Sequence, residues 1–277
     1  MTECSGLIDL HSHSTASDGQ YSASQVAERS AAAGVAVWAL TDHDSVAGLE
    51  TGARAAAERG MRFVPGIELS AYLDRREIHV LGHFVDVRST ALRQFEDLLA
   101  EKRRLRMGEI IGKLAAMGVV LAPEEIERFS GGKTLGRPHV ARAMVEKGVA
   151  TTVRDAFDRY LGEGRPAYVG RHRLSAQEAI ALIRGAGGAA TLAHPGVSKM
   201  ERGDLERLAH LGLTGIETYH PDHNPSLRTK FLRIAREFSL IPTAGSDFHG
   251  EAVAPERRFG LVTMSEQELA RLEERRG

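Results

Sequence analysis

Short apolar runs alternate with amphipathic segments through most of this 277-residue chain. The runs "LIDL", "VAVWAL" and "IEL" have the length of buried strands, and apolar residues recur at helical spacing between them. Ser22 with Gln25, and Ser175 with Glu178, match the capping box that begins a helix. Strands that alternate with helices favour parallel pairing, so this pattern predicts an α/β layered or barrel fold.

The alternation stops after Val87 and resumes after "GRPAYVG". Residues 88–165 show helical spacing without a strand, and "AATLAH", "TGIETY" and "LIPTAGSDFH" then read as further strands. We therefore expect an α/β domain made of residues 1–87 and 166–277, with a helical insertion at 88–165. The insertion holds 15 Lys and Arg against 11 Asp and Glu, a net charge of +4 that could attract phosphate.

Composition excludes several classes of protein. The formal net charge of -1 argues against a globally basic nucleic-acid binder, and no apolar run reaches the ~20 residues of a membrane span. The N-terminus lacks a signal-peptide pattern, so a cytoplasmic location is expected. Cys4 is the single cysteine and cannot form an internal disulfide. Nothing in the sequence indicates a protein partner.

Nearly every predicted strand ends in a side chain that can bind a metal. In barrels of alternating strands and helices, the C-terminal strand ends meet at one face, so these residues should converge. Imidazole and carboxylate ligands without thiolate suit zinc, manganese or iron(II). The set exceeds the needs of one ion, which indicates two or three ions and hydrolytic chemistry. The candidates are His11, His13, Asp18, His43, Glu68, His79, His83, His194, Glu217, Asp247 and His249.

Seven motifs, in order, resemble the polymerase and histidinol phosphatase (PHP) superfamily: "DLHSHSTASDG", "ALTDHDSVAG", "GIELS", "EIHVLGHFVD", "AHPG", "GIE" and "GSDFHG". They are most similar to its stand-alone metal-dependent phosphoesterases, which include nucleoside 3',5'-bisphosphate phosphatases and exoribonucleases. The resemblance covers nearly the whole chain. It implies a distorted (β/α)7 barrel with an inserted small helical domain and a trinuclear metal centre.

The resemblance also implies how the ligands are shared. One ion would be held by His11, His13, Glu68 and Asp247, and Glu68 would bridge to a second ion bound by His79 and His194. A third ion would take Asp18, His43 and His249. His79 and His83 compete for one role, and the match "EIHVLG" favours His79. Asp9 and Asp42 each adjoin a ligand motif and would orient the imidazole ligands by hydrogen bonding to them without touching the metal.

Substrate contacts are expected from two further motifs. "GRPHVA" places Arg137 and His139 at the start of a helix, where Arg137 could clamp a phosphate; the alternative is an exposed arginine on a Pro-started helix. "ETYHPDHN" offers His220 and His223, and the resemblance favours His223 as the group that contacts phosphate or protonates the leaving oxygen; a simple loop histidine is the alternative. Lys199, Arg171 and His172 are weaker candidates.

The expected activity is hydrolysis of a phosphomonoester by a metal-bridging hydroxide, with Arg137 and His223 as catalytic groups. The expected substrate is a nucleoside 3',5'-bisphosphate or a short oligoribonucleotide end. Two alternatives remain open at this point. One is a histidinol-phosphate phosphatase, and the other is a non-catalytic, metal-stabilised binding module of the same fold. An amidohydrolase is disfavoured because no strand-end lysine is suited to bridging two metals after carboxylation.

Overall fold

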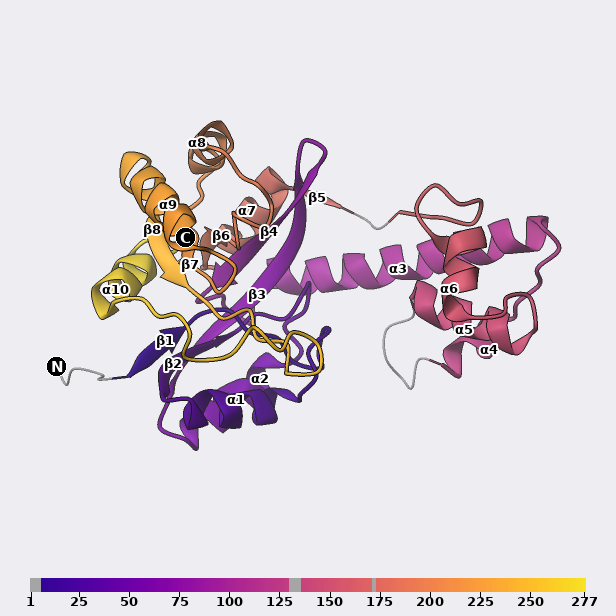
Figure 1. Cartoon of the computed structure of the whole chain (residues 1–277), viewed down its shortest axis with the longest axis horizontal. Helices are drawn as coiled ribbons and strands as arrows, with labels where there is room; N and C mark the ends of the chain where they lie inside the picture. The colour runs from indigo at the N-terminus through magenta and orange to yellow at the C-terminus, as the bar shows by residue number, and fades with distance from the viewer. Residues whose placement is uncertain (1–5, 130–135, 171–172) are drawn as a thin grey trace. The chain divides into compact units, whose positions relative to one another are not determined.

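The computed structural model describes residues 6–129, 136–170 and 173–277. The chain divides into two compact units (Figure 1). The α/β unit comprises Met1–Arg93 and Arg173–Gly277, and the helical unit comprises Gln94–His172. The helical unit begins and ends several residues later than the segment 88–165 expected from the sequence pattern.

Eight strands form one mixed sheet in the α/β unit, which confirms the α/β fold class. Backbone hydrogen bonds also join the chain after the first strand to the chain around the last: Leu10 N–H donates to Ala244 O and Asp247 N–H donates to His11 O, each at 2.9 Å. These bonds bring the two edges of the sheet together. The hydrogen-bonded order is β1 (Leu7–Asp9), β2 (Val35–Leu40), β3 (Arg62–Leu73), β4 (Arg76–His83), β6 (Ala189–Leu192), β7 (Gly215–Tyr219) and β8 (Ile241–Ala244), while β5 (Leu174–Ser175) pairs with β3.

Strand β4 departs from the expected parallel pairing. It runs antiparallel to both β3 and β6, whereas the other pairs in the sheet are parallel. The cause is local, because only Asp74 and Arg75 separate β3 from β4, and so short a connection can join only antiparallel strands. Asp74 takes the left-handed conformation, with φ 58°, that such a tight turn requires.

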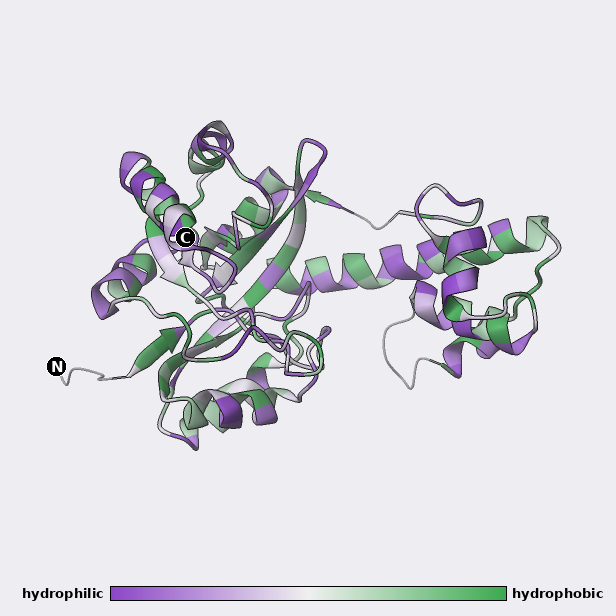
Figure 2. Cartoon of the chain, viewed as in Figure 1, coloured by the Kyte–Doolittle hydropathy of each residue, from purple (hydrophilic) through white to green (hydrophobic). Residues whose placement is uncertain are grey.

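Six helices pack on the outside of this sheet. The capping boxes Ser22–Gln25 and Ser175–Glu178 are both present, as predicted. Each of the helices turns an apolar face inward, and Figure 2 shows hydrophilic and hydrophobic residues alternating along them. The helices are α1 (Ala23–Ala32), α2 (Leu49–Ala57), α7 (Ala176–Gly185), α8 (Arg202–His210), α9 (Pro225–Glu237) and α10 (Glu266–Glu274).

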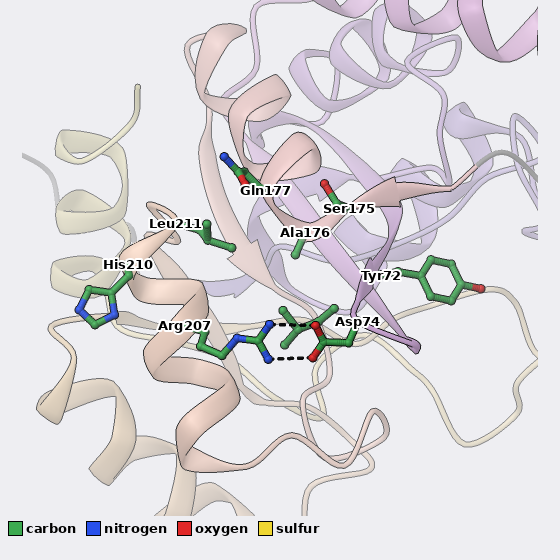
Figure 3. Close-up of a pocket in the computed structure, with 9 residues that line it drawn as sticks. Tyr72, Asp74, Ser175, Ala176, Gln177, Arg207, His210 and Leu211 are labelled. Carbon is green, nitrogen blue, oxygen red and sulfur yellow. Dashed lines mark hydrogen bonds and ion pairs between the residues drawn. The ribbon is translucent and has the colours of Figure 1, made fainter.

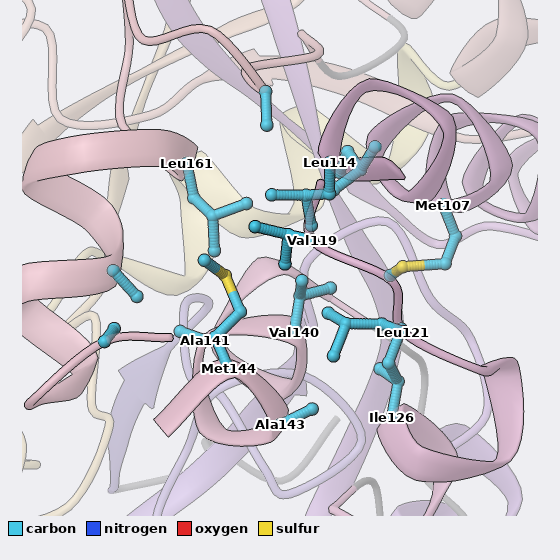
Figure 4. Packing of buried hydrophobic residues seen from close by; sticks show 14 residues of the cluster. Met107, Leu114, Val119, Leu121, Ile126, Val140, Ala141, Ala143, Met144 and Leu161 are labelled. Atoms are coloured by element: carbon cyan, nitrogen blue, oxygen red, sulfur yellow. The ribbon is translucent and has the colours of Figure 1, made fainter. Parts of the chain in front are cut away.

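The helical unit has a hydrophobic core of its own. Helix α3 (Thr90–Ala116) runs into it, and α4 (Pro123–Glu127), α5 (Arg137–Glu146), α6 (Val153–Ala156) and the π-helical turn η1 (Phe157–Leu161) follow. Figure 4 shows buried aliphatic and methionine side chains from these elements packed together. Within the described residues, no helix is apolar over a stretch long enough to cross a bilayer. The core includes Met107, Ile110, Leu114, Val140 and Met144.

Candidate metal centre

Four side chains from distant parts of the sequence meet in the α/β unit. His11 and His13 follow β1, Glu68 lies within β3, and Asp247 follows β8. The Nε2 atoms of His11 and His13 are 3.1 Å apart, and each lies 3.3 Å from Asp247 Oδ1. Glu68 Oε2 is 3.2 Å from the Nε2 of His11 and 3.1 Å from that of His13. All four side chains are buried.

These separations fit a single divalent cation. Four ligands about 2.1 Å from a tetrahedral ion are about 3.4 Å from one another, close to the spacing of the four atoms here. The group His11, His13, Glu68 and Asp247 could therefore hold one cation, and these are the residues expected around the first ion.

The second oxygen of Glu68 faces a different pair of histidines. Glu68 Oε1 lies 2.9 Å from His79 Nδ1 and 3.3 Å from His194 Nε2. A carboxylate with one oxygen on each of two ligand groups has the geometry to bridge two ions. His43 adjoins this group as well, with its Nδ1 3.2 Å from Glu68 Oε2.

His83 lies away from these groups. Its Nε2 donates to the backbone carbonyl of Leu10 at 2.9 Å, and its Nδ1 is 3.3 Å from Thr191 Oγ1. Burial lowers the pKa of His83 to about 4, which keeps this ring neutral. The structure thus brings His79 to the cluster and makes His83 a hydrogen-bonded core residue.

A third group is more open to solvent. Asp18 Oδ1 lies 3.3 Å from His249 Nε2, and Asp18 Oδ2 lies 3.8 Å from His43 Nε2. His13 contributes its Nδ1, 3.8 Å from Asp18 Oδ1. The Asp18 side chain is 58% exposed, whereas the other two carboxylates of the cluster are buried. The three residues expected around a third ion are therefore close together, with His13 beside them.

Charge in the cluster is tightly coupled. Burial opposes ionisation of Glu68, but the imidazoles of His43 and His11 outweigh it, and the pKa of Glu68 lies well below its usual value. Burial likewise disfavours protonated His13, but Asp247 and Glu68 outweigh it and raise the pKa of His13 to about 9. The buried carboxylates of Glu68 and Asp247 are thus stabilised by positive charge on the neighbouring imidazoles. Divalent ions bound between the same side chains would supply positive charge as well.

Several imidazole nitrogens of the cluster are buried without a well-aligned hydrogen bond. Among the described residues these are the Nδ1 atoms of His13, His43, His79 and His194, of which those of His43 and His79 lie 3.2 and 2.9 Å from Glu68 oxygens. Buried polar atoms are normally hydrogen-bonded, so nitrogens of this kind beside carboxylates are typical of a place that can bind a cation. The donor set, which combines imidazole with carboxylate, fits divalent transition metals.

Glu217, in the middle of β7, contacts two of the candidate ligands. Its Oε1 lies 2.9 Å from His11 Nδ1, and its Oε2 accepts the backbone N–H of His194 at 2.7 Å. With the proton of His11 on Nδ1, the Nε2 lone pair is free to face the cluster. Glu217 was a strand-end candidate in the sequence, but its pattern carried no signal for this supporting role.

Asp9 and Asp42 were expected to orient imidazoles, but among the described residues their hydrogen bonds go to backbone N–H groups and hydroxyls. Asp9 accepts the backbone N–H groups of His11 and Ser246 at 3.2 and 3.1 Å. Asp42 accepts from Ser14 N–H and from the Ser14 and Ser17 hydroxyls. Both carboxylates therefore hold the backbone of the ligand loops.

Two of the candidate ligands have an uncommon backbone conformation. His194 has φ 24° and Asp247 has φ 52°, in the left-handed region that side chains with a Cβ rarely adopt. Such strain persists only where the surrounding contacts enforce it, and it is concentrated at functional sites. His194 lies two residues after the end of β6 and Asp247 three residues after the end of β8, in the turns that lead away from these buried strands.

His220 and His223 differ in what their rings contact. His223 Nε2 accepts the Gly196 N–H at 3.0 Å, and its Nδ1 donates to Thr218 O at 3.1 Å, so both nitrogens are engaged by backbone. His220 Nδ1 accepts the Asp222 N–H, which places the proton of the neutral ring on Nε2. His220 Nε2 is buried without a hydrogen-bond partner among the described residues and lies 3.6 Å from Asp247 Oδ2.

Arg257 is a neighbour of the cluster that the sequence motifs did not reveal. It lies in the connection between β8 and α10, and its Nη1 donates to Asp247 Oδ2. Its Nη2 donates to Asp222 Oδ2 at 2.9 Å. An arginine ten residues after a ligand motif has no spacing that marks it, so only the fold identifies it.

Arg137 and His139 belong to the helical unit. Arg137 Nη1 donates to Leu161 O at 3.1 Å, and its guanidinium lies 5.0 Å from the centre of the Tyr168 ring. His139 Nδ1 accepts the Gly136 N–H at 3.0 Å and so caps α5. Both side chains thus have partners within their own unit. Lys199 is an exposed residue with φ 51°, and Arg171 and His172 lie outside the described residues.

A surface hollow of about 400 Å³ lies beside the tip of the β3–β4 hairpin (Figure 3). Arg207 and Asp74 form a two-bonded ion pair across it, at 2.8 and 3.0 Å. Its other lining residues come from the end of β3, from β5 and the start of α7, and from the end of α8, and none is a candidate ligand. The hollow is therefore separate from the metal centre.

Comparisons with known proteins agree with this geometry. The chain is 36% identical to the 3',5'-nucleoside bisphosphate phosphatase of Chromobacterium violaceum, with 87% of each chain covered. It is 34% identical to the 5'-3' exoribonuclease Rnm of Salmonella typhimurium, covering 88% of this chain and 85% of that one. A solved structure from Bifidobacterium adolescentis, of a protein proposed to be a metal-dependent phosphoesterase, matches with a TM-score of 0.76 at 26% identity and covers 99% of this chain and 97% of that one. The model of the PHP domain matches residues 9–161, more than half of the chain, so the chain belongs to the PHP family.

Proposed function

We propose that this metal-dependent phosphoesterase removes a phosphate from nucleotides, with the 3'-phosphate of nucleoside 3',5'-bisphosphates or the end of a short oligoribonucleotide as its substrate. The observation that carries the proposal is the convergence of His11, His13, Glu68 and Asp247 around one small space, with the second oxygen of Glu68 on His79 and His194. Two relatives that match most of this chain's length are named as a nucleoside bisphosphate phosphatase and an exoribonuclease.

Two or three divalent ions, of manganese, zinc or iron, are proposed for these groups. Ions held there would polarise the phosphoryl oxygens and supply a nucleophile at neutral pH. The chain itself contributes the arrangement of the ligands: Glu68 spans two of the groups, and Glu217 fixes the ring of His11. The open third group at Asp18 is the proposed entry side for a phosphate ester, because the first group is buried.

The groups proposed to contact the substrate are His220, His223, Arg137 and His139. His220 is the better placed of the two loop histidines, because its Nε2–H has no hydrogen-bond partner among the described residues and lies near Asp247. His223 could give a proton to the leaving oxygen only by exchanging one of its two backbone bonds. Arg137 uses one of its five N–H donors on Leu161 O, and the others are available for a phosphate.

A phosphate-release screen tests the proposal. Manganese-loaded protein is assayed with 3'-phosphoadenosine 5'-phosphate, 5'-AMP, 3'-AMP, a 5'-phosphorylated RNA pentamer and histidinol phosphate. We expect the highest kcat/KM on the bisphosphate nucleotide or the RNA. Preference for histidinol phosphate would replace the proposed substrate, and release from none of the five with metal bound would favour a binding module. Asp247→Asn is the inactive control, with its Tm measured to confirm folding.

A further inference from the structure

The two oxygens of Asp247 face opposite sides. Oδ1 lies 3.3 Å from the Nε2 atoms of His11 and His13 and 3.4 Å from His249 Nδ1. Oδ2 faces away from that space, where it accepts a hydrogen bond from Arg257 Nη1. The carboxylate therefore offers one oxygen to the proposed ion, while the other accepts from a guanidinium and lies 3.6 Å from His220 Nε2.

Arg257 is itself held in place by a second carboxylate. Its Nη2 donates to Asp222 Oδ2 at 2.9 Å, and its side chain is 22% exposed. Asp222 lies in the connection between β7 and α9, and Arg257 in that between β8 and α10. A planar guanidinium can hold two carboxylates at fixed angles, which a lysine ammonium cannot do. The pair of contacts therefore joins both loops to the ligand Asp247.

We infer that Arg257 is a positioning residue for the metal centre: it holds Oδ2 of Asp247 so that Asp247 offers Oδ1 alone, and Asp222 fixes the guanidinium for that task. The inference rests on the metal centre proposed above. Asp247 has φ 52°, a left-handed conformation that is uncommon for a residue with a Cβ, and its backbone N–H donates to His11 O at 2.9 Å, so Arg257 acts on a side chain whose backbone is already fixed. Partners behind metal ligands typically change metal affinity by about 10- to 100-fold when removed.

A different role for Arg257 would be direct contact with the substrate phosphate. Its Nε is a buried donor without a hydrogen-bond partner among the described residues, so one donor is unused. The two roles predict different measurements. A positioning residue changes the retention of metal in the absence of substrate, whereas a phosphate contact changes KM and leaves metal binding as it was.

The test compares Arg257→Gln, Arg257→Lys and Asp222→Asn with a matched control. Arg258→Gln removes a neighbouring arginine whose side chain donates to Pro255 O in the same exposed loop and does not contact a candidate ligand among the described residues. Each protein is loaded with manganese and equilibrated against a series of chelator concentrations, and the retained metal is measured by mass spectrometry. We expect affinity to fall about 10-fold or more in Arg257→Gln, to fall less in Arg257→Lys and Asp222→Asn, and to stay at the wild-type value in Arg258→Gln.

Each outcome has one meaning. Loss of manganese from the wild-type protein itself, at chelator concentrations where a transition-metal site should hold it, would refute the metal centre rather than the role of Arg257. Wild-type retention in Arg257→Gln overturns the inference, whether or not KM rises. If Arg257→Gln fails to fold by circular dichroism, Asp222→Asn decides, because that residue is on the rim and is 34% exposed.

Discussion

The Nδ1 of His11 lies 2.9 Å from Oε1 of Glu217, and both residues are buried. The other oxygen of Glu217 accepts the backbone N–H of His194 at 2.7 Å. One carboxylate thus sets the ring orientation of a ligand in the first group and the backbone of a ligand beside the second.

Replacing Glu217 by Gln should weaken both supports. Glutamine has a single acceptor oxygen, so one of the two N–H groups would meet an NH2 donor instead. We expect about 10- to 100-fold weaker manganese binding in a competition titration, with kcat reduced in parallel. Glu274→Gln, at an exposed position in α10, is the control and should bind as wild type. Unchanged affinity in Glu217→Gln would show that His11 is oriented by other contacts.

His79 and His83 should give opposite results when changed. His79→Ala removes a nitrogen 2.9 Å from Glu68 Oε1, so the number of manganese ions bound per chain should fall. His83→Gln should keep the wild-type number, because His83 is bonded to Leu10 O and Thr191 instead. Metal content after gel filtration distinguishes the two variants, and the reverse pattern would mean that β4 is placed in a different register.

Much of the metal centre was predictable because its residues sit at strand ends. The α/β fold brings one end of each strand to one face, so local apolar runs located His11, His43, His194 and Asp247 without any knowledge of their contacts. The choice between His79 and His83 was not accessible in this way. Four residues apart on one strand, they share a face, and only the pairing of β4 with its neighbours places one of them at the cluster.

The supporting residues were less predictable than the ligands. The direction of β4 depends on a two-residue turn at Asp74, which looks like any polar loop in the sequence. Arg257 reaches Asp247 from a connection without regular secondary structure, and Asp42 binds loop backbone rather than an imidazole. Such contacts depend on how loops fold over the sheet, and no periodicity encodes that.

The stability of the metal-free protein should depend on pH through His83. Burial lowers its pKa to about 4 in the folded state, against about 6.5 in the unfolded chain. The unfolded state therefore binds the extra proton between these values. The contribution of His83 is fully present above about pH 6.5 and is lost as the pH falls towards 4, by about 2 kcal/mol between pH 8 and pH 5.

Urea denaturation in chelator at pH 8 and pH 5 measures this effect. The free energy of unfolding of wild type should fall by about 2 kcal/mol more than that of His83→Gln over this interval. Comparing the two proteins cancels the titration of the other histidines, which both retain. Equal pH dependence in the two would show that His83 is not a buried neutral ring.

Gly196 should not tolerate a side chain. A Cβ at this position would lie 2.7 Å from both Cδ2 and Nε2 of His223, whose ring is held on its other side by Thr218 O. The His223 ring cannot move away from the added methyl group without breaking its hydrogen bond to Thr218 O. Gly196→Ala should therefore cost about 1–3 kcal/mol of unfolding free energy. It should also shift the loop that begins at His194 and thereby lower metal-dependent activity.

Gly203→Ala in helix α8 is the matched control. A Cβ at Gly203 would meet nothing within 4 Å, so this variant should be as stable as wild type or more stable. The Tm of each variant is measured by thermal unfolding in the presence of chelator. Equal Tm values for Gly196→Ala and Gly203→Ala would contradict the prediction, because they would mean that the His223 ring can move and that its two backbone hydrogen bonds do not fix the loop.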